Sequence, residues 1–268
     1  MKRKSNCLFL IAFGIVLGIF CFAAGHLLQI YLEYQKGDKT YDKLQEYVTD
    51  AKKPEVPDDM NTDNPEASDS EEKTPYLQVD FDSLQAINLN VLAWIEIPAL
   101  EISYPVVQGG DNSYYLSHLF TGEYNNNGSI FVDYHNKGDF TDKNTIVYGH
   151  NMKNGSMFGT LDHYADQVLY EQFPYFYIYI PGRIYQYQIL SCYAGRTGSM
   201  GYTYRFGNKD DFLKFLETIQ DYAGYETNLE VTLDDRVVTL STCIDSSRDY
   251  RYLVHGKLIK ELYPDGTE

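Results

Sequence analysis

The sequence predicts a mainly β fold, a closed or nearly closed barrel of about eight strands with a few peripheral helices. Short β-type runs follow one another, and Gly-, Asn- and Asp-rich turns separate several of them. Tyrosine occurs 26 times, against 14 phenylalanines and 1 tryptophan, and this residue suits half-buried strands and polar grooves. The 268 residues are enough for one domain with a full core and further segments.

The N-terminal region is expected to deliver the chain to a membrane. A basic tail over residues 1–6 precedes an almost wholly apolar run over 7–30, which is long enough to cross a hydrocarbon core of ~30 Å as a helix. The basic cluster favours a cytoplasmic N-terminus, with the rest of the chain outside. A cleaved signal peptide is the alternative, because Ala23-Ala24-Gly25 offers small residues for cleavage. Both alternatives place the folded domain outside the cytoplasm, and an uncleaved signal anchor fits the long apolar run better.

Residues 31–75 are predicted to connect this anchor to the folded domain. They begin as a juxtamembrane helix and continue, from residue 53, as a segment rich in Pro, Asp, Glu, Ser and Asn. Such a composition leaves little to bury, so a flexible acidic linker that holds the domain away from the membrane is expected. The folded, extracellular domain is predicted to span residues 76–268.

Within this domain a short helix is expected first, with Asp80 and Asp82 as caps and an end at Ile87. Apolar residues at helical spacing predict another helix over 209–221, and one or two short helices are expected within 156–172. The predicted strands cover 93–98, 101–107, 128–134, 144–150, 175–181, 183–193, 236–243 and 250–259.

Charge and cysteine content exclude several classes of function. The net charge of −16 argues against nucleic-acid binding, because a phosphate backbone requires a basic face. Only Cys192 and Cys243 lie outside the apolar N-terminal run, so the domain is no disulfide scaffold. The two cysteines could pair, or one could be a reactive thiol. No zinc-ligand spacing or EF-hand pattern occurs, and neither a metal nor a cofactor is expected.

Cys243 and His150 are the candidates for nucleophilic chemistry. Each ends an apolar strand and precedes a loop, the arrangement in which a rigid scaffold presents a reactive group to solvent. A thiol with its ordinary pKa of about 8.5 needs a histidine or another positive neighbour to act as a nucleophile. A buried structural cysteine is the competing interpretation from position alone. The other histidines of the domain, at 118, 135, 163 and 255, lack a comparable setting.

Arg251 lies 251 − 243 = 8 positions after Cys243, at the start of the next strand. If the two strands are neighbours, its guanidinium can approach the thiol and donate hydrogen bonds to a developing oxyanion. Arg248 competes for this role, because it lies in the intervening loop.

These residues lie within segments that resemble the class B sortases. TLSTC (239–243), followed by Arg251, resembles the family's T-L-x-T-C signature and downstream arginine. The histidine segment 144–161 and the segments 94–98, 104–116 and 128–134 resemble further parts of that class. The resemblance extends over about residues 80–260, essentially the whole folded domain.

The resemblance implies a sortase-type barrel, with an N-terminal helix and a helix before the cysteine strand, and a transpeptidase activity. Cys243 would attack the Thr carbonyl of a C-terminal sorting motif and form a thioester. An amine of a cell-wall precursor or a pilin would then accept the acyl group. His150 would be the general acid and base, and Arg251 would hold the oxyanion. The positions that line the family's substrate groove are Asn112, Leu116, Tyr148 and Ser241.

Two features limit what the resemblance transfers. The groove wall contributed by 194–207 has no alignable counterpart, and Ile244 stands where class B members often carry a polar or acidic residue. The alternatives are a different cysteine acyl-transferase or peptidase, and a non-catalytic domain that faces the cell wall. The order His before Cys argues against a papain-like enzyme, and the presence of all three expected residues argues against a decayed site.

Overall fold

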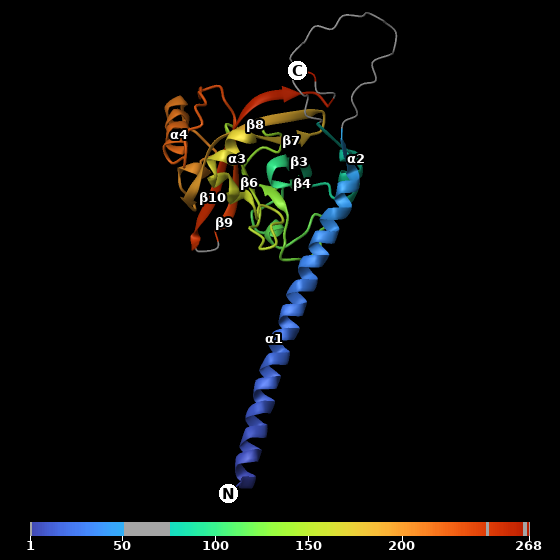
Figure 1. The fold of residues 1–268 in the computed structure, drawn as a ribbon. Coiled ribbons are helices and arrows are strands. Elements are labelled where there is room, and N and C mark those ends of the chain that lie inside the picture. Colours follow the sequence, from blue (N-terminus) through green and yellow to red (C-terminus); the bar gives the residue numbers. More distant parts are fainter. Residues whose placement is uncertain (1, 51–75, 245–246, 265–266, 268) are drawn as a thin grey trace, which may run out of the picture.

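The computed structural model describes residues 2–50, 76–244, 247–264 and 267 (Figure 1). The predicted acidic linker therefore lies almost entirely outside the described residues and stays a prediction. The helices are α1 (Lys2–Leu44), α2 (Phe81–Ile87), α3 (Gln167–Gln172) and α4 (Lys209–Asp221). The strands are β1 (Val48–Asp50), β2 (Leu77–Val79), β3 (Val91–Ile97), β4 (Ile102–Val107), β5 (Ile130–Val132), β6 (Asn144–Tyr148), β7 (Tyr175–Ile180), β8 (Arg183–Arg196), β9 (Val237–Ile244) and β10 (Ser247–Leu262).

Eight of these strands close into a barrel, in the order β10-β8-β7-β3-β4-β5-β6-β9. Hydrogen bonding is antiparallel except at two junctions, where β4 pairs with β5 and β6 pairs with β9 in parallel. Closure gives each of these eight strands a neighbour on both sides. The interior is filled by apolar and aromatic side chains such as the fully buried Trp94 and Phe176. The predicted barrel with peripheral helices is confirmed.

Helix boundaries follow from local chemistry. The Asp80 carboxylate accepts a hydrogen bond from the Ser83 amide and caps α2, as predicted. Helix α4 covers the predicted range, and its N-cap is Asn208, whose side chain accepts from the Asp211 amide. The buried face of α4 packs in a second apolar cluster beside the barrel, formed by Phe212, Phe215, Leu216 and Ile219 with residues of β8, β9 and β10.

Strand register brings two distant segments to the same end of the barrel. Tyr148 in β6 lies opposite Ser241 in β9, and the two strands run in parallel. His150 follows Tyr148 by two residues and Cys243 follows Ser241 by two, so both leave the barrel together. In the antiparallel pair of β9 and β10, Arg251 lies opposite Cys243. The barrel therefore assembles the three predicted catalytic residues at one rim.

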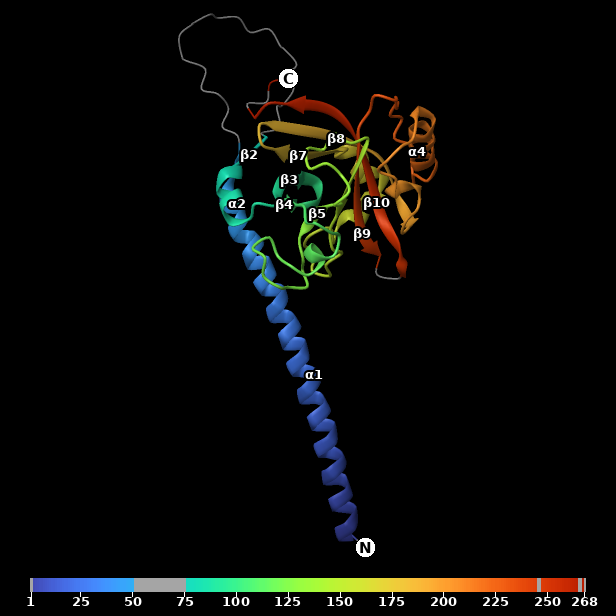
Figure 2. The ribbon, with the colours of Figure 1, turned by 180° about the vertical axis from the view of Figure 1, so that it is seen from behind.

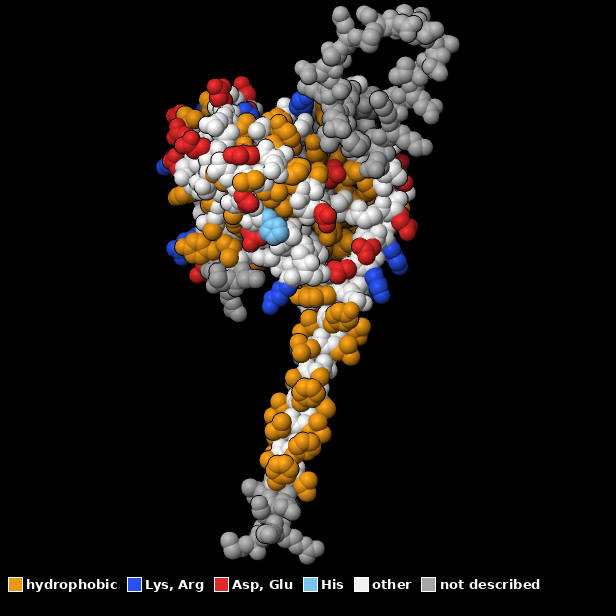
Figure 3. All heavy atoms as spheres, viewed as in Figure 1, with side chains coloured by type: hydrophobic (Ala, Val, Ile, Leu, Met, Phe, Trp, Pro, Cys, Tyr) orange, Lys and Arg blue, Asp and Glu red, His pale blue; other side chains and the backbone are white. Residues whose placement is uncertain are grey.

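Helix α1 projects from the barrel as a long rod (Figures 1 and 2). Residues 9–32 carry exposed apolar side chains, many of which are seen on the face in Figure 3. The helix is long and apolar enough, by length and composition, to cross a membrane. Residues 33–45, called the stem below, instead pack against the barrel, where Tyr41 and Leu44 are buried. Strand β1 follows the stem and pairs with β2. The stem thus reaches the barrel before residues 51–75 begin.

Candidate active site

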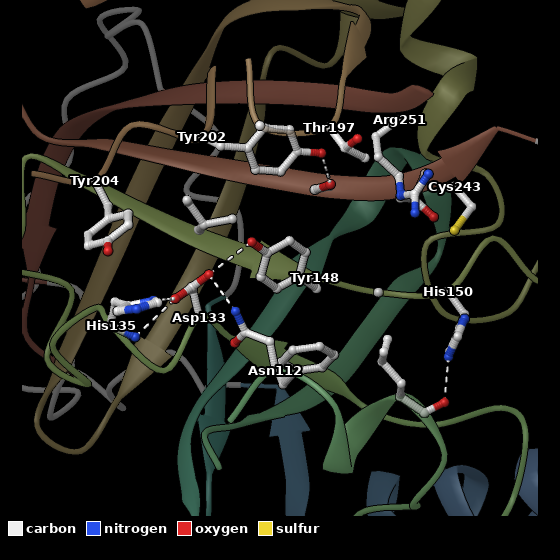
Figure 4. Close-up of a pocket in the computed structure, with 17 residues that line it drawn as sticks. Asn112, Asp133, His135, Tyr148, His150, Thr197, Tyr202, Tyr204, Cys243 and Arg251 are labelled. Atoms are coloured by element: carbon white, nitrogen blue, oxygen red, sulfur yellow. Dashed lines mark hydrogen bonds and ion pairs between the residues drawn. The ribbon is translucent and has the colours of Figure 1, made fainter. Parts of the chain in front are cut away.

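A groove with a volume of about 400 Å³ opens at this rim of the barrel (Figure 4). Its walls come from β5, β6, β9, β10 and the loops that follow β4 and β8. The lining residues are Asn112, Leu116, Phe131, Asp133, His135, Ile146, Tyr148, Gly149, His150, Thr197, Gly198, Tyr202, Tyr204, Ser241, Thr242, Cys243 and Arg251. All seven site residues predicted from the sequence are among them. Two groups of side chains lie at the two ends of the groove. The end with Cys243, His150 and Arg251 is called the reactive end below, and the end with Asp133, Asn112 and Tyr148 the recognition end.

Cys243 stands at the reactive end of the groove. It is exposed although the six residues before it in β9 are buried, so the strand holds the backbone while the thiol faces solvent. Cys192 lies inside the domain. It is buried, its Sγ lies 3.0 Å from the Tyr164 carbonyl oxygen and 3.3 Å from the Tyr225 hydroxyl, and burial raises the pKa of its thiol. Both thiols are free, so the possibility that they pair is wrong.

His150 lies beside Cys243 and is oriented by a backbone carbonyl (Figure 4). Its Nε2 lies 2.7 Å from the Leu116 carbonyl oxygen. A carbonyl can only accept, so Nε2 carries the hydrogen and Nδ1 has the free lone pair in the neutral ring. A nucleophile, a base and a third group that orients the base are the parts that an activated thiol requires. Here the third group is the Leu116 carbonyl.

Arg251 approaches the same end of the groove from β10. Its Nη1 donates to the Tyr250 carbonyl oxygen at 2.9 Å, and its guanidinium lies next to Cys243 in Figure 4. Tyr202 lies close enough to Arg251 and Cys243 for both to affect the pKa of its hydroxyl. Burial raises the pKa of Tyr202, a hydrogen bond with Ser241 and the charge of Arg251 oppose this, and Cys243 adds to it. The cation is thus close to the place where a tetrahedral oxyanion on Cys243 would develop. The side chain of Arg248 lies outside the described residues.

The other end of the groove is a hydrogen-bonded network around Asp133. Asn112 Nδ2 donates to Oδ2 of Asp133 at 2.7 Å, the Tyr148 hydroxyl donates to the same oxygen at 2.9 Å, and His135 donates to Oδ1 through its backbone amide. The His135 ring nitrogen Nδ1 lies 2.8 Å from Oδ1. Burial raises the pKa of Asp133, but these hydrogen bonds outweigh burial and hold it below its ordinary value. The ring of His135 also stacks on Tyr204.

The four predicted groove residues act in different ways. Asn112 and Tyr148 belong to the Asp133 network, and the Ser241 hydroxyl lies 2.8 Å from the Tyr202 hydroxyl. Leu116 contributes its half-exposed side chain to the wall and its carbonyl to His150. The residues that sequence reasoning missed are Asp133, His135, Thr197, Tyr202 and Tyr204. The only available signal was the Asp133-Tyr134-His135 tripeptide at a strand end.

A family model described as the sortase domain matches residues 95–259. The chain belongs to the sortase family. Sortase B of Listeria monocytogenes is 39% identical over 179 residues, which cover 66% of this chain and 72% of that protein. Sortase B from Bacillus anthracis aligns with a TM-score of 0.70 and 31% identity, over 86% of this chain and 99% of that one.

Two further similar structures are complexes of sortase B with a bound molecule. A Staphylococcus aureus sortase B–substrate complex aligns with a TM-score of 0.64 and 35% identity, over 67% of this chain and 84% of that chain. A sortase B complexed with triglycine aligns with the same TM-score and identity, over 67% of this chain and 85% of that chain. The chain is therefore a class B sortase, a cysteine transpeptidase, and the expectation drawn from its motifs is confirmed.

Proposed function

We propose that Cys243 is the nucleophile of this sortase, His150 its general acid and base, and Arg251 its oxyanion donor. The observation that carries the proposal is the convergence of the three side chains at one end of the groove, with the His150 tautomer set by the Leu116 carbonyl. The three residues come from two strand ends and a neighbouring strand, so the barrel fixes their separation before substrate arrives.

The reaction follows from this arrangement. The Cys243 thiol gives its proton to Nδ1 of His150, and the thiolate attacks the Thr carbonyl carbon of a C-terminal sorting motif. The Arg251 guanidinium stabilises the oxyanion of the tetrahedral intermediate. The peptide C–N bond then breaks, and the leaving amine takes the proton from His150. A thioester between Thr and Cys243 remains.

The second half of the reaction runs in reverse order with a different amine. The acceptor amine attacks the thioester carbon, His150 takes the proton of the amine, and Cys243 leaves as a thiolate. A cell-wall precursor or a pilin would supply this amine, and the triglycine bound to a related sortase B supports a small amine-bearing acceptor. Asn112, Leu116, Tyr148 and Ser241 line the groove where the sorting motif would lie.

The same proposal places α1 in the cell membrane as a single span. The run 7–30 would cross the bilayer, with the tail 1–6 in the cytoplasm and the barrel outside. Intact-mass measurement of the chain in the membrane fraction tests this, because cleavage after Gly25 would leave a chain that begins at His26. A mass corresponding to that shorter chain would replace the anchor with a signal peptide.

Peptide cleavage by the full chain in detergent tests the chemistry. A library of candidate sorting-motif peptides is incubated with the protein, with and without triglycine, and the products are identified by mass spectrometry. We expect cleavage after Thr, and a Thr–triglycine product only when the amine is present. A product set that is independent of the amine, or cleavage at another residue, would contradict the transpeptidation step.

A further inference from the structure

The stem contacts two segments near His150: residues 125–129, which pack against the imidazole, and the loop that follows His150 in sequence. We propose that the stem is part of the catalytic apparatus, and that the Tyr41 hydroxyl is a positioning group that holds His150, through residues 125–129, in the orientation that serves Cys243. This inference rests on the proposed role of His150. It assigns to the juxtamembrane segment a function beyond that of a spacer.

The Tyr41 side chain is buried, and its hydroxyl has three polar neighbours in the barrel. It is 3% exposed, and its hydroxyl donates to the Gly128 carbonyl oxygen at 2.6 Å. The same hydroxyl oxygen accepts from the Phe120 amide at 3.3 Å and lies 2.9 Å from Ser129 Oγ. Burial raises the pKa of Tyr41, so the hydroxyl keeps its proton and remains a donor to Gly128 at any pH where the protein works.

Gly128 carries this constraint directly to the catalytic histidine. It has a φ of +58°, and a Cβ at this position would stand 2.9 Å from His150 Cδ2 and 2.9 Å from the Leu116 carbonyl oxygen. The Gly128 backbone is therefore in contact with the imidazole edge and with the carbonyl that orients it. Any shift of Gly128 reaches both neighbours, because close-packed interiors transmit displacement.

A second arm of the stem holds the loop that follows His150. Oδ2 of Asp38 accepts from Asn154 Nδ2 at 3.0 Å. The Tyr41 ring packs edge-on against Tyr104, whose hydroxyl accepts from the Met157 amide at 3.3 Å. Residues 150–157 are thus tied to α1 at two places, and they include the residue that donates from its side chain to the Cys243 carbonyl, Asn151.

Contacts with the stem add to those of the barrel around His150. His150 follows the end of β6 at Tyr148, and residues 125–129 precede β5. The stem binds 125–129 again where Asn125 Nδ2 donates to the Glu33 carbonyl oxygen at 3.0 Å. No contact between the stem and the Asp133 network occurs among the hydrogen bonds of the described residues. A stem defect should therefore impair proton transfer more than motif binding.

The test compares Tyr41→Phe with Tyr31→Phe in the full chain in detergent. Among the hydrogen bonds of the described residues, the Tyr31 hydroxyl accepts one from Gln35 of its own helix, so Tyr31→Phe removes a phenol hydroxyl outside the stem. We expect Tyr41→Phe to lower kcat for sorting-peptide cleavage about tenfold, with KM changed less than about twofold, and Tyr31→Phe to match wild type. The rate at which iodoacetamide alkylates Cys243 is measured by mass spectrometry at a series of pH values. This pH profile should change in Tyr41→Phe and stay as in wild type in Tyr31→Phe.

Gly128→Ala provides a second variant that leaves every stem side chain in place. Its Cβ would stand 2.6 Å from the Tyr115 carbonyl oxygen and 2.9 Å from both His150 Cδ2 and the Leu116 carbonyl oxygen, at a φ of +58° that strains alanine. This variant should show the same loss in kcat and the same change in the alkylation profile. The inference is overturned if Tyr41→Phe keeps the wild-type kcat and alkylation profile, or if its loss disappears after correction for the folded fraction by circular dichroism. If wild type cleaves no sorting peptide, the proposed function fails, and the alkylation profiles still decide the role of the stem.

Discussion

The two ends of the groove are built in opposite ways. At the reactive end, Cys243 and His150 sit where strands give way to loops, and the thiol is exposed. At the recognition end, Asp133 is buried and accepts hydrogen bonds from Asn112, Tyr148 and His135. In the proposed mechanism Cys243 and His150 change partners during catalysis, and the exposed thiol suits that change. The Asp133 carboxylate is instead held by three donors.

Loss of a side chain should therefore affect kcat, KM and stability differently at the two ends. Removal of a reactive group should lower kcat and leave the fold intact, because few contacts depend on it. Removal of a network member should raise KM and lower stability together, since partners are left unsatisfied.

Cys243→Ala should give the largest effect. Cleavage of sorting peptides should fall to background, a loss of at least about 10⁴-fold, because the covalent intermediate cannot form. The melting temperature should stay within about 2 °C of wild type, since the thiol is exposed. Cys192→Ala is the matched control, with activity retained and the unfolding free energy lowered by about 1–3 kcal/mol. Activity in Cys243→Ala would remove the nucleophile from this position.

Arg251→Ala should lower kcat/KM by about 10²–10³-fold, the usual cost of an oxyanion donor. Arg251→Lys should recover only part of this, because an ammonium lacks the planar fork of donors. Steady-state cleavage kinetics measure both. Arg248→Ala is the control, and a dead Arg248→Ala beside an active Arg251→Ala would move the oxyanion role to the earlier arginine.

Asp133→Asn should raise KM about tenfold and change kcat less than about threefold. Its amide nitrogen would face either the two donors that share Oδ2, Asn112 and Tyr148, or the His135 backbone amide at Oδ1, and each of these needs an acceptor. The pKa of Asp133 is lowered in the folded state, so its contribution to stability is present above the unfolded value of about 3.9 and is lost as pH falls through the folded value. Thermal melts of both proteins between pH 6 and about 2 measure this. Parallel curves would show that the network contributes no charge-dependent stability.

The smallest effect at neutral pH is expected at His255, beneath the wall of the groove. The residue is fully buried, and burial lowers its pKa to about 3. The unfolded chain takes up a proton near pH 6.5, so stability is complete above that pH and decreases as pH falls toward 3. His255→Gln should flatten this part of the melting curve, whereas the exposed His163→Gln should not. An unchanged slope in His255→Gln would assign the acid sensitivity to other groups.

Much of the reactive end could be predicted because strands carry their own signal. Alternation and apolar runs mark where β6 and β9 end, and the residues near each end are His150 and Cys243. Parallel pairing then brings them together. Arg251 was expected near Cys243 only if the two strands were neighbours, and the family resemblance favoured it over Arg248. The pairing of β9 with β10 meets that condition. The barrel and α4 could be predicted for the same reason, because the pattern that defines each element is local.

Asn112 and Tyr148 at the recognition end were predicted only through the family resemblance, and the stem only as part of a juxtamembrane helix. Their partners, Asp133 and the barrel, could not be predicted, because these contacts are remote in sequence. Tyr202 lines the groove only because the loop that carries it is held by Asn144, whose Nδ2 donates to the carbonyl oxygens of Gly201 and Thr203. Tyr41 and Gly128 are 87 residues apart. Tyr41 lies only a few turns after the apolar run, and the sequence has no feature that separates a tyrosine at the membrane border from one that binds the barrel.

Helix α1 is continuous from the apolar run to the stem, so its length fixes how far the stem lies from the apolar run. Each residue of a helix adds about 1.5 Å of height and about 100° of rotation. With the proposed anchor in the bilayer, a residue inserted between the apolar run and the stem would turn the groove to face another direction over the membrane. Four inserted residues would lift the groove by about 6 Å and nearly restore its bearing. The number of residues between Ile30 and Glu33 therefore sets both the height of the groove above the membrane and the direction in which it faces.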